Sequence, residues 1–260
     1  MTATFKKMIT PFGVVGDKVT AGIFATHIAV LLIVWTFLVP EHSFFPNLVE
    51  VLGAWRELWK HGLFFHIFAT LKLCGAATVI SILISCTVAY ASTIPAFSPI
   101  SQFFSKLRFN PIQGFTIFFT SVTGGGRNLQ ITLLVIFMSF YFITSLMSMI
   151  KDIPEEDFVR RKAQRMNNWK ILWKVVVVDR RDYLVEVIRV NLSISLMMIV
   201  SVESMDKSQG GLGALLKDTD RAMAFPKIFA LQLTILVLGI VLDYALRSLY
   251  NSYPSNKKST

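Results

Sequence analysis

The residues of this chain that could do chemistry include two glycine-rich segments, but neither has the pattern of a nucleotide site. A phosphate-binding loop needs a Lys-Ser/Thr pair after its glycines, because that lysine and the backbone N–H groups hold the phosphates together. No such pair follows segment 124–127. Segment 208–211, Ser-Gln-Gly-Gly, is only faintly similar to an ATPase signature. We therefore expect any ATP hydrolysis to take place in a separate chain.

The histidines and cysteines do not predict a metal site or a disulfide. His61 and His66 are five residues apart, a poor spacing for two ligands of one metal on a helix. Cys74 and Cys86 would lie about 18 Å apart on one helix, too far for a disulfide, so we interpret both as packing residues. The histidines fit packing or interfacial positions, and they are His27, His42, His61 and His66.

The apolar residues are gathered in long blocks, which predicts an all-α integral membrane protein with six transmembrane helices. Of 260 residues, 53% are hydrophobic and 16% are charged, and the mean hydropathy is +0.57. A helix needs about 20 apolar residues to cross the hydrocarbon core. The first block is too long for a cleaved signal peptide and has no small-residue cleavage site, so we expect it to be retained. The predicted spans are 19–39, 65–91, 111–123, 129–150, 187–202 and 228–249.

The distribution of lysine and arginine predicts that both chain ends are cytoplasmic. The net charge is +10, and with a cytoplasmic N-terminus most of the 26 basic residues fall in inside segments, nine of them between Lys151 and Arg181. Lys106 and Arg108 are assigned to an inside segment on the same basis. Because the basic residues separate apolar blocks and form no soluble basic face, we expect no nucleic-acid partner. The predicted organisation is a cytoplasmic segment 1–18, a transmembrane domain 19–250 with a cytoplasmic loop 151–186, and a cytoplasmic tail 251–260.

Two segments outside the spans have amphipathic patterns. Segment 43–62 carries Trp55 and Trp59 one turn apart, which is typical of an interfacial helix on the outer surface. In the cytoplasmic loop, Pro154 and three acids open a helix and basic residues follow, an order that complements the helix dipole. This loop helix could dock in a groove of a partner protein or lie against lipid headgroups, and its pattern favours neither. Its candidate contact residues are Glu155, Glu156, Val159, Arg160, Ala163, Met166, Asn167 and Trp169.

Small polar residues recur along two of the predicted spans. On span 65–91 they lie three or four residues apart and share one face, and on span 187–202 a polar pair is spaced one turn apart. Such residues either let helices approach closely or line a translocation path. The candidate path residues are Thr78, Ser81, Ser85, Asn191 and Ser195.

The loop resembles a motif of a known transporter family. The pattern Ile-Pro-Glu-Glu at 153–156, Ala163, and Asn-Asn-Trp-Lys-Ile-Leu-Trp-Lys-Val at 167–175 is similar to the EAA loop of ABC importer permeases. Other parts of the chain resemble permeases of the nitrate, sulfonate and taurine type. They are segments 45–52, 62–67, 70–72 and 242–247, and Glu203 followed by Gly-Gly-Leu-Gly at 210–213. The loop departs from the family pattern at Asn167, which stands where glycine is typical, and near Val178, where the typical proline is absent. Asparagine tolerates a left-handed conformation, so we expect Asn167 to form the same turn.

The resemblance implies a non-catalytic permease subunit of a binding-protein-dependent ABC importer in the bacterial inner membrane. Its loop would couple to ATPase subunits that bind the ATP and magnesium, and this chain itself would hold no cofactor or metal. A second permease copy, an extracytoplasmic substrate-binding protein and membrane lipid would be its other partners. Glu203, Gly211 and Gly213 would belong to a periplasmic loop. The altered motif also fits a transport-inactive scaffold or regulatory subunit. A membrane-embedded enzyme or a proton-coupled transporter should carry clustered or mid-span acids, which the predicted spans lack.

Overall fold

The structure is a computed structural model that describes residues 16–38 and 44–252. Within these ranges the chain is helical and contains no strand. Parts of the predicted N-terminal segment, of the first span and of the tail lie outside the described residues. The same holds for Lys6, Lys7, His42, Lys257 and Lys258.

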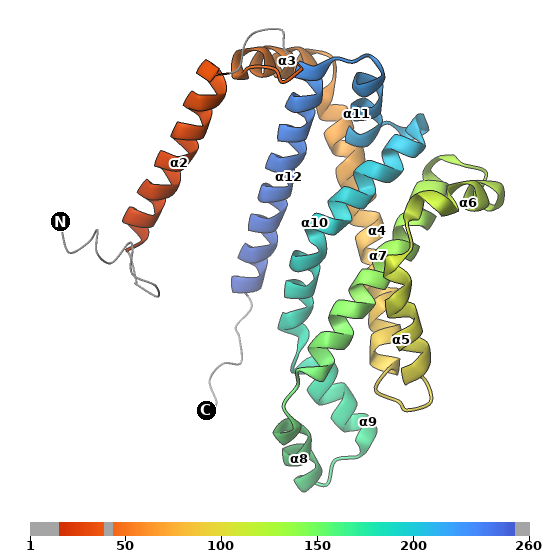
Figure 1. Cartoon of the computed structure of the whole chain (residues 1–260). Helices are drawn as coiled ribbons and strands as arrows, with labels where there is room; N and C mark the ends of the chain where they lie inside the picture. The colour runs from red at the N-terminus through yellow and green to blue at the C-terminus, as the bar shows by residue number, and fades with distance from the viewer. Residues whose placement is uncertain (1–15, 39–43, 253–260) are drawn as a thin grey trace.

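Five helices are long and apolar enough to cross a membrane, so the chain has the helices of a multi-pass membrane protein. They correspond to five of the six predicted spans. In chain order they are α2 (Asp17–Leu38), α4 (Leu63–Ala91), α7 (Gly126–Lys151), α10 (Arg181–Met205) and α12 (Phe225–Ser252). In Figure 1, α2 begins and α12 ends at their lower tips, both at about mid-height of the molecule and above α8 and α9.

The remaining helices are short and lie at the two ends of the long ones or beside α7. The upper end in Figure 1 carries α3 (Leu48–Lys60), the 3-10 turn η4 (Lys207–Gln209) and α11 (Leu212–Arg221). The lower end carries α8 (Glu155–Ala163), α9 (Asn168–Ile171) and the π-helix η3 (Leu172–Val178). Beside α7 lie α5 (Ser98–Lys106), the 3-10 turns η1 (Leu107–Phe109) and η2 (Ile112–Phe115), and α6 (Thr116–Thr123).

The predicted span 111–123 is not one membrane-spanning helix. It consists of η2 and the eight-residue α6, and the apolar stretch is shorter than a crossing requires. Pro111 has an extended backbone and no N–H group, so it separates this stretch from η1. The chain instead climbs from the lower to the upper end of α7 through α5, η1, η2 and α6 in succession (Figure 1).

Hydrogen bonds show where segment 98–123 lies along the length of α4 and α7. Near the lower end, Ser101 Oγ donates to the Val88 carbonyl of α4 at 3.0 Å. Higher up, the hydroxyl of Thr144 donates to the carbonyl of Ser105, and that of Tyr141 donates to the carbonyl of Arg108 at 3.1 Å. Arg108 and the neighbouring Lys106 therefore lie beside the middle of α7. The structure shows that α5 turns back along the bundle, which the sequence did not predict, and the cytoplasmic assignment of these two residues stays a prediction.

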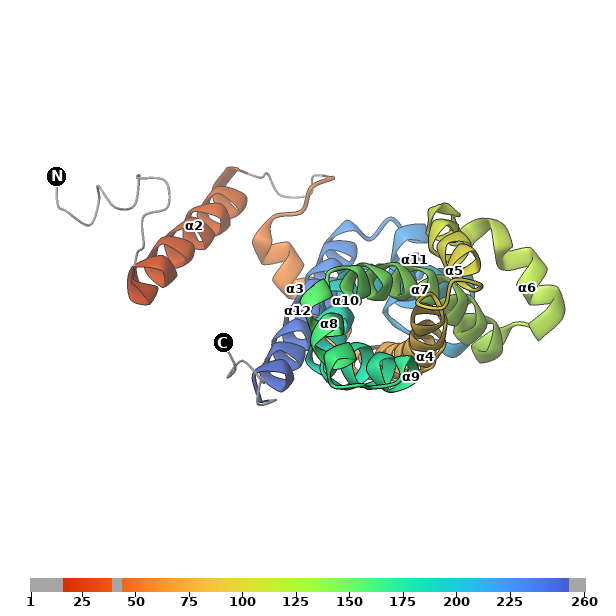
Figure 2. The same ribbon diagram turned by 90° about the horizontal axis from the view of Figure 1, so that it is seen from below.

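The largest apolar core lies where α4, α7 and α10 pack together. Helix α4 makes its most extensive contact with α7, and α10 packs on both. A second core joins α3, α4, α11 and α12 at the upper end. In the view from below (Figure 2), α2 stands apart from this bundle. The main core is built on side chains that include Leu73, Ala77, Leu133, Leu134, Phe142, Leu146 and Ile199.

Helix α3 confirms the amphipathic pattern predicted for segment 43–62. Asn47 and Glu50 form a capping box that fixes its first turn. One face packs on α12, where Trp55 Nε1 donates to Thr234 Oγ1 at 3.0 Å, while Trp59 remains 46% exposed. An apolar face thus contacts the bundle, while polar groups and the apolar side chains of Val49, Leu52 and Trp59 remain exposed.

Candidate functional site

The first candidate region is a polar junction at the upper end, centred on the carboxylate of Glu203. This side chain is fully buried near the end of α10. Thr70 Oγ1 of α4 donates to it across 2.9 Å, and the Gly213 N–H donates to Glu203 Oε2 at 2.9 Å. The Leu212 N–H donates in turn to Thr70 Oγ1 at 2.9 Å. The first N–H groups of α11 are therefore satisfied by side chains of two other helices, which locks α4, α10 and α11 together.

Two glycines allow this close approach, each for a different reason. Gly211 has φ +111°, and a Cβ there would lie 2.2 Å from Glu203 Cδ. Gly213 has an ordinary φ, but a Cβ would lie 2.0 Å from the Val200 carbonyl oxygen. A side chain at either position would overlap atoms of α10, so the junction requires both glycines.

The sequence predicted Glu203, Gly211 and Gly213 as residues of one periplasmic loop. The structure brings the three together, but Glu203 lies in α10 and Gly213 in α11, so only Gly211 lies between helices. The sequence did not predict the partners from α4. His66 Nδ1 lies 3.0 Å from the Gly211 carbonyl oxygen and 3.2 Å from its nitrogen, and Thr70 supplies the bridging hydroxyl. His66 and Thr70 are one turn apart on α4. That spacing was the sequence feature that could have indicated two polar side chains on one face of the helix.

A second carboxylate extends the junction towards α7. Asp206 accepts hydrogen bonds from the Gly126 N–H at the start of α7 and from the Ser208 N–H at 3.1 Å. Burial alone would raise the pKa of Asp206, but the hydrogen bonds from Ser208 and Gly126 outweigh it and lower that pKa below its usual value. In α7, Gln130 Nε2 donates to the Asp206 carbonyl at 2.7 Å.

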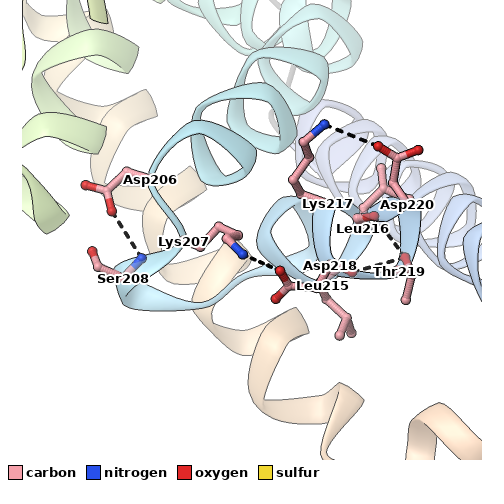
Figure 3. Close-up of polar contacts among 9 residues, drawn as sticks. All are labelled: Asp206, Lys207, Ser208, Leu215, Leu216, Lys217, Asp218, Thr219 and Asp220. Carbon is pink, nitrogen blue, oxygen red and sulfur yellow. Dashed lines mark hydrogen bonds and ion pairs between the residues drawn. The ribbon is translucent and has the colours of Figure 1, made fainter. Parts of the chain in front are cut away.

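The outer face of this loop is covered by ion pairs (Figure 3). Lys207 pairs with Asp218, and Lys217 pairs with Asp220 at 3.2 Å. These groups are partly exposed, so each pair stabilises the fold little. The Thr70 hydroxyl and the Glu203 carboxylate are buried and bonded to each other and to backbone N–H groups, so the geometry is that of a rigid joint between helices.

The second candidate region is the loop of α8, α9 and η3 at the lower end. Arg180 donates to Asp157 at 3.2 Å, and Arg161 donates to Asp179 at 3.2 Å. These pairs join α8 to the two residues that precede α10. All four side chains are partly exposed to solvent, so the connection is weak and sensitive to salt.

An apolar cluster attaches the same loop to the bundle. Ile153, Ile171, Val175 and Val176 are buried together. Tyr90 near the end of α4, Ile150 of α7, Phe158 and Met166 pack against them. A hollow of about 620 Å³ lies between α8, α9 and the turn at 93–95.

The outward surface of the loop combines charge with exposed apolar side chains. Val159 is 58% exposed, Trp169 66% and Trp173 63%. The predicted contact residues Glu155, Glu156, Arg160, Ala163 and Asn167 are exposed, and Met166 is half-buried. The structure thus leaves seven of the eight predicted contact residues accessible on one segment, as either docking or headgroup contact would require.

The predicted left-handed turn at Asn167 is wrong. Asn167 has φ −68° and ψ 147° and immediately precedes the first residue of α9. The left-handed residue is Arg165, at φ 57°. The turn therefore comes two residues earlier than the family pattern suggests, directly after α8.

The five candidate path residues are placed mainly in contacts within the chain. Ser81 and Ser85 donate to the Val135 and Ser139 carbonyls of α7. Asn191 Nδ2 donates to Ser145 Oγ of α7 at 2.9 Å. Ser195 donates to the Asn191 carbonyl within α10, and Thr78 is half-buried on α4. These bonds support the helix-packing alternative, while the path role stays a prediction.

Among the described residues, no group of three or more His, Cys, Asp or Glu side chains lies close enough to hold a metal ion. Comparisons with protein-family models and with curated proteins find no match for this chain.

Proposed function

We propose that this chain is the permease subunit of an ATP-driven importer. Two permease copies would surround a path for a small solute of the nitrate, sulfonate or taurine kind. Separate ATPase subunits would drive alternating access, and an extracytoplasmic binding protein would deliver the solute. The chain would lie in a bacterial inner membrane with both ends in the cytoplasm, and it would make and break no covalent bond itself.

The observation that carries the proposal is the attachment of the exposed loop to the bundle. Helix α8 is joined to the start of α10 by Asp157–Arg180 and Arg161–Asp179, and the apolar cluster joins it to α4 and α7. A force applied to the outward face of α8 would therefore reach three long helices. A loop attached to several long helices at once is what a coupling element between an ATPase and a permease needs.

Site-specific photo-crosslinking in native membranes tests this role. A benzophenone amino acid at Val159 or Trp169 should capture a protein that carries a phosphate-binding loop, whereas the same label at Leu31 of α2 should not. The purified complex should hydrolyse ATP. Trp169→Glu should abolish capture by the label at Val159, and Val159→Glu with Trp169→Glu should abolish the co-purified ATPase activity. Capture of lipid alone, or ATPase activity unchanged by the double variant, would remove the docking role.

The altered residues of the loop motif favour one alternative, a transport-inactive scaffold or regulatory subunit. The left-handed turn of the loop is formed at Arg165 and not at the position typical of the family. ATP hydrolysis by the reconstituted complex distinguishes the two. Stimulation by a solute-loaded binding protein would exclude the scaffold, and hydrolysis that never responds to solute would exclude the importer.

A further inference from the structure

The broken segment from Lys106 to Gln113 places polar groups at the middle of the bundle. Tyr141, which bonds to the Arg108 carbonyl, lies about 15 Å above Lys151, at about 1.5 Å per helical residue. Because the hydrocarbon core is about 30 Å thick, the segment lies near its centre if α7 crosses the membrane.

The backbone of this segment is not a continuous helix. Asn110 has ψ 134° and Pro111 has φ −73° and ψ 132°, so both are extended between η1 and η2. Backbone of this kind cannot face lipid, because its polar groups would be left without partners. It is tolerated at membrane depth only inside protein or along a water-filled cavity.

The polar side chains of the segment are accessible on the surface of the chain, beside the 77% exposed ring of Phe109. Lys106, Asn110 and Gln113 are exposed, and Arg108 is half-buried with its guanidinium 5.0 Å from the Phe109 ring centre. Within the described part of the chain, neither Lys106 nor Arg108 forms an ion pair. An unpaired cation at this depth is costly in lipid and is found facing a polar cavity.

We propose that the Lys106–Gln113 face lines a water-filled path through the membrane, and that Lys106 and Arg108 make this path favour negatively charged groups. The inference rests on the proposed function in treating the path as a solute path. It assigns a lining element that differs from the polar residues of α4 and α10, whose hydrogen bonds are made largely within the chain.

Cysteine accessibility tests the proposal without knowledge of the solute. Asn110→Cys and Gln113→Cys are made in a Cys74→Ala, Cys86→Ala background, with Leu31→Cys on the isolated α2 as the control. Leu31 is 67% exposed on an apolar helix. In proteoliposomes without a membrane potential, each variant is treated with anionic sulfonatoethyl and cationic trimethylammonioethyl methanethiosulfonate. If the protein with both alanine substitutions does not accumulate in the membrane, the new cysteines are made in the wild-type background that keeps Cys74 and Cys86. Their labelling rate is then compared with that of the wild-type chain.

We expect both new cysteines to react at least about tenfold faster than Leu31→Cys. We also expect the anionic reagent to be favoured, relative to its rate with free 2-mercaptoethanol, by about tenfold, since charges lining a cleft raise the local concentration of opposite charge. Lys106→Gln with Arg108→Gln should remove that preference while leaving the cysteines accessible.

Two outcomes would overturn the proposal. Rates as slow as that of Leu31→Cys would mean that protein covers the segment. An unchanged anion preference in the double glutamine variant would mean that the cations do not set it. Crosslinking of the loop to an ATPase is measured separately, so the failure of either inference leaves the other intact.

Discussion

The upper junction and the lower loop hold helices together by opposite means. At the junction, the fully buried Glu203 is bonded to Thr70 and Gly213 in a space that leaves no room for a Cβ at Gly211. At the loop, partly exposed ion pairs and a small apolar cluster do the same work. Buried, hydrogen-bonded polar groups rigidify a structure, whereas exposed pairs exchange readily with water and salt. The molecule thus has one end suited to stay fixed and one suited to move.

Among the substitutions that test this difference between the two ends, Gly213→Ala should lower the stability most. The added Cβ would overlap the Val200 carbonyl, and α10 would have to shift from α11. We expect a loss of about 3 kcal/mol or more, seen as a lower apparent melting temperature by tryptophan fluorescence in detergent. Gly75→Ala in α4, with open space around it, should be neutral or stabilising. Equal behaviour of the two variants would mean that the junction is loosely packed.

Thr70→Val should have the next largest effect. Valine keeps the shape of threonine but removes the donor to Glu203 and the acceptor for the Leu212 N–H. Leaving these buried groups unpaired should cost about 1–3 kcal/mol in the same unfolding measurement. Thr120→Val is the matched control, because that exposed hydroxyl bonds only to its own helix. A cost below that of the control would show that water replaces the lost bonds.

The ion pair Asp157–Arg180 should have a smaller effect. Asp157→Asn and Arg180→Gln should each change stability by less than about 1 kcal/mol, with a coupling energy that decreases at high salt. A double-mutant cycle at low and high ionic strength measures that coupling. Coupling as large as at the junction, or insensitive to salt, would remove the contrast between the two ends.

Asp206→Asn should have the smallest effect, and it should depend on pH. The folded pKa of Asp206 lies below its usual value, so its carboxylate adds stability that is present at neutral pH and lost as the pH falls through the folded pKa. The wild-type chain should therefore lose more stability than the variant on acidification from about pH 5 to about pH 3. Parallel melting temperatures across that range would contradict the assignment.

The sequence was sufficient to predict the parts of the fold that depend on composition. Helices α4, α7, α10 and α12 follow from apolar blocks long enough to cross a bilayer. The break in the third predicted span did not follow, because α5 is a short separate helix held in place by packing on α7 and α4, and the sequence pattern does not show this packing. The position of Arg108 along α7 depends on the same packing, so it could not be predicted from the local sequence pattern.

The candidate sites divide in the same way. Glu203 and the glycines after it were close in sequence and could be grouped, whereas Thr70 and His66 are brought to them from 133 and 145 residues away. The turn at Arg165 could not be predicted because arginine has no preference for a left-handed backbone. It is imposed by the geometry that takes the chain from α8 to α9.

Helix α2 has a consequence for how the chain evolves. None of its spanning window is buried within the described chain, while most of the corresponding window of α7 is. A helix in hydrocarbon needs no neighbours to satisfy its backbone, so solvation by lipid alone can keep α2 ordered. Its side chains must be apolar enough for the bilayer, but they need not fit the shape of a packed protein interior. Exchanges among leucine, isoleucine, valine and phenylalanine should accumulate freely in α2, whereas the same exchanges in α7 would disturb an interlocked interior.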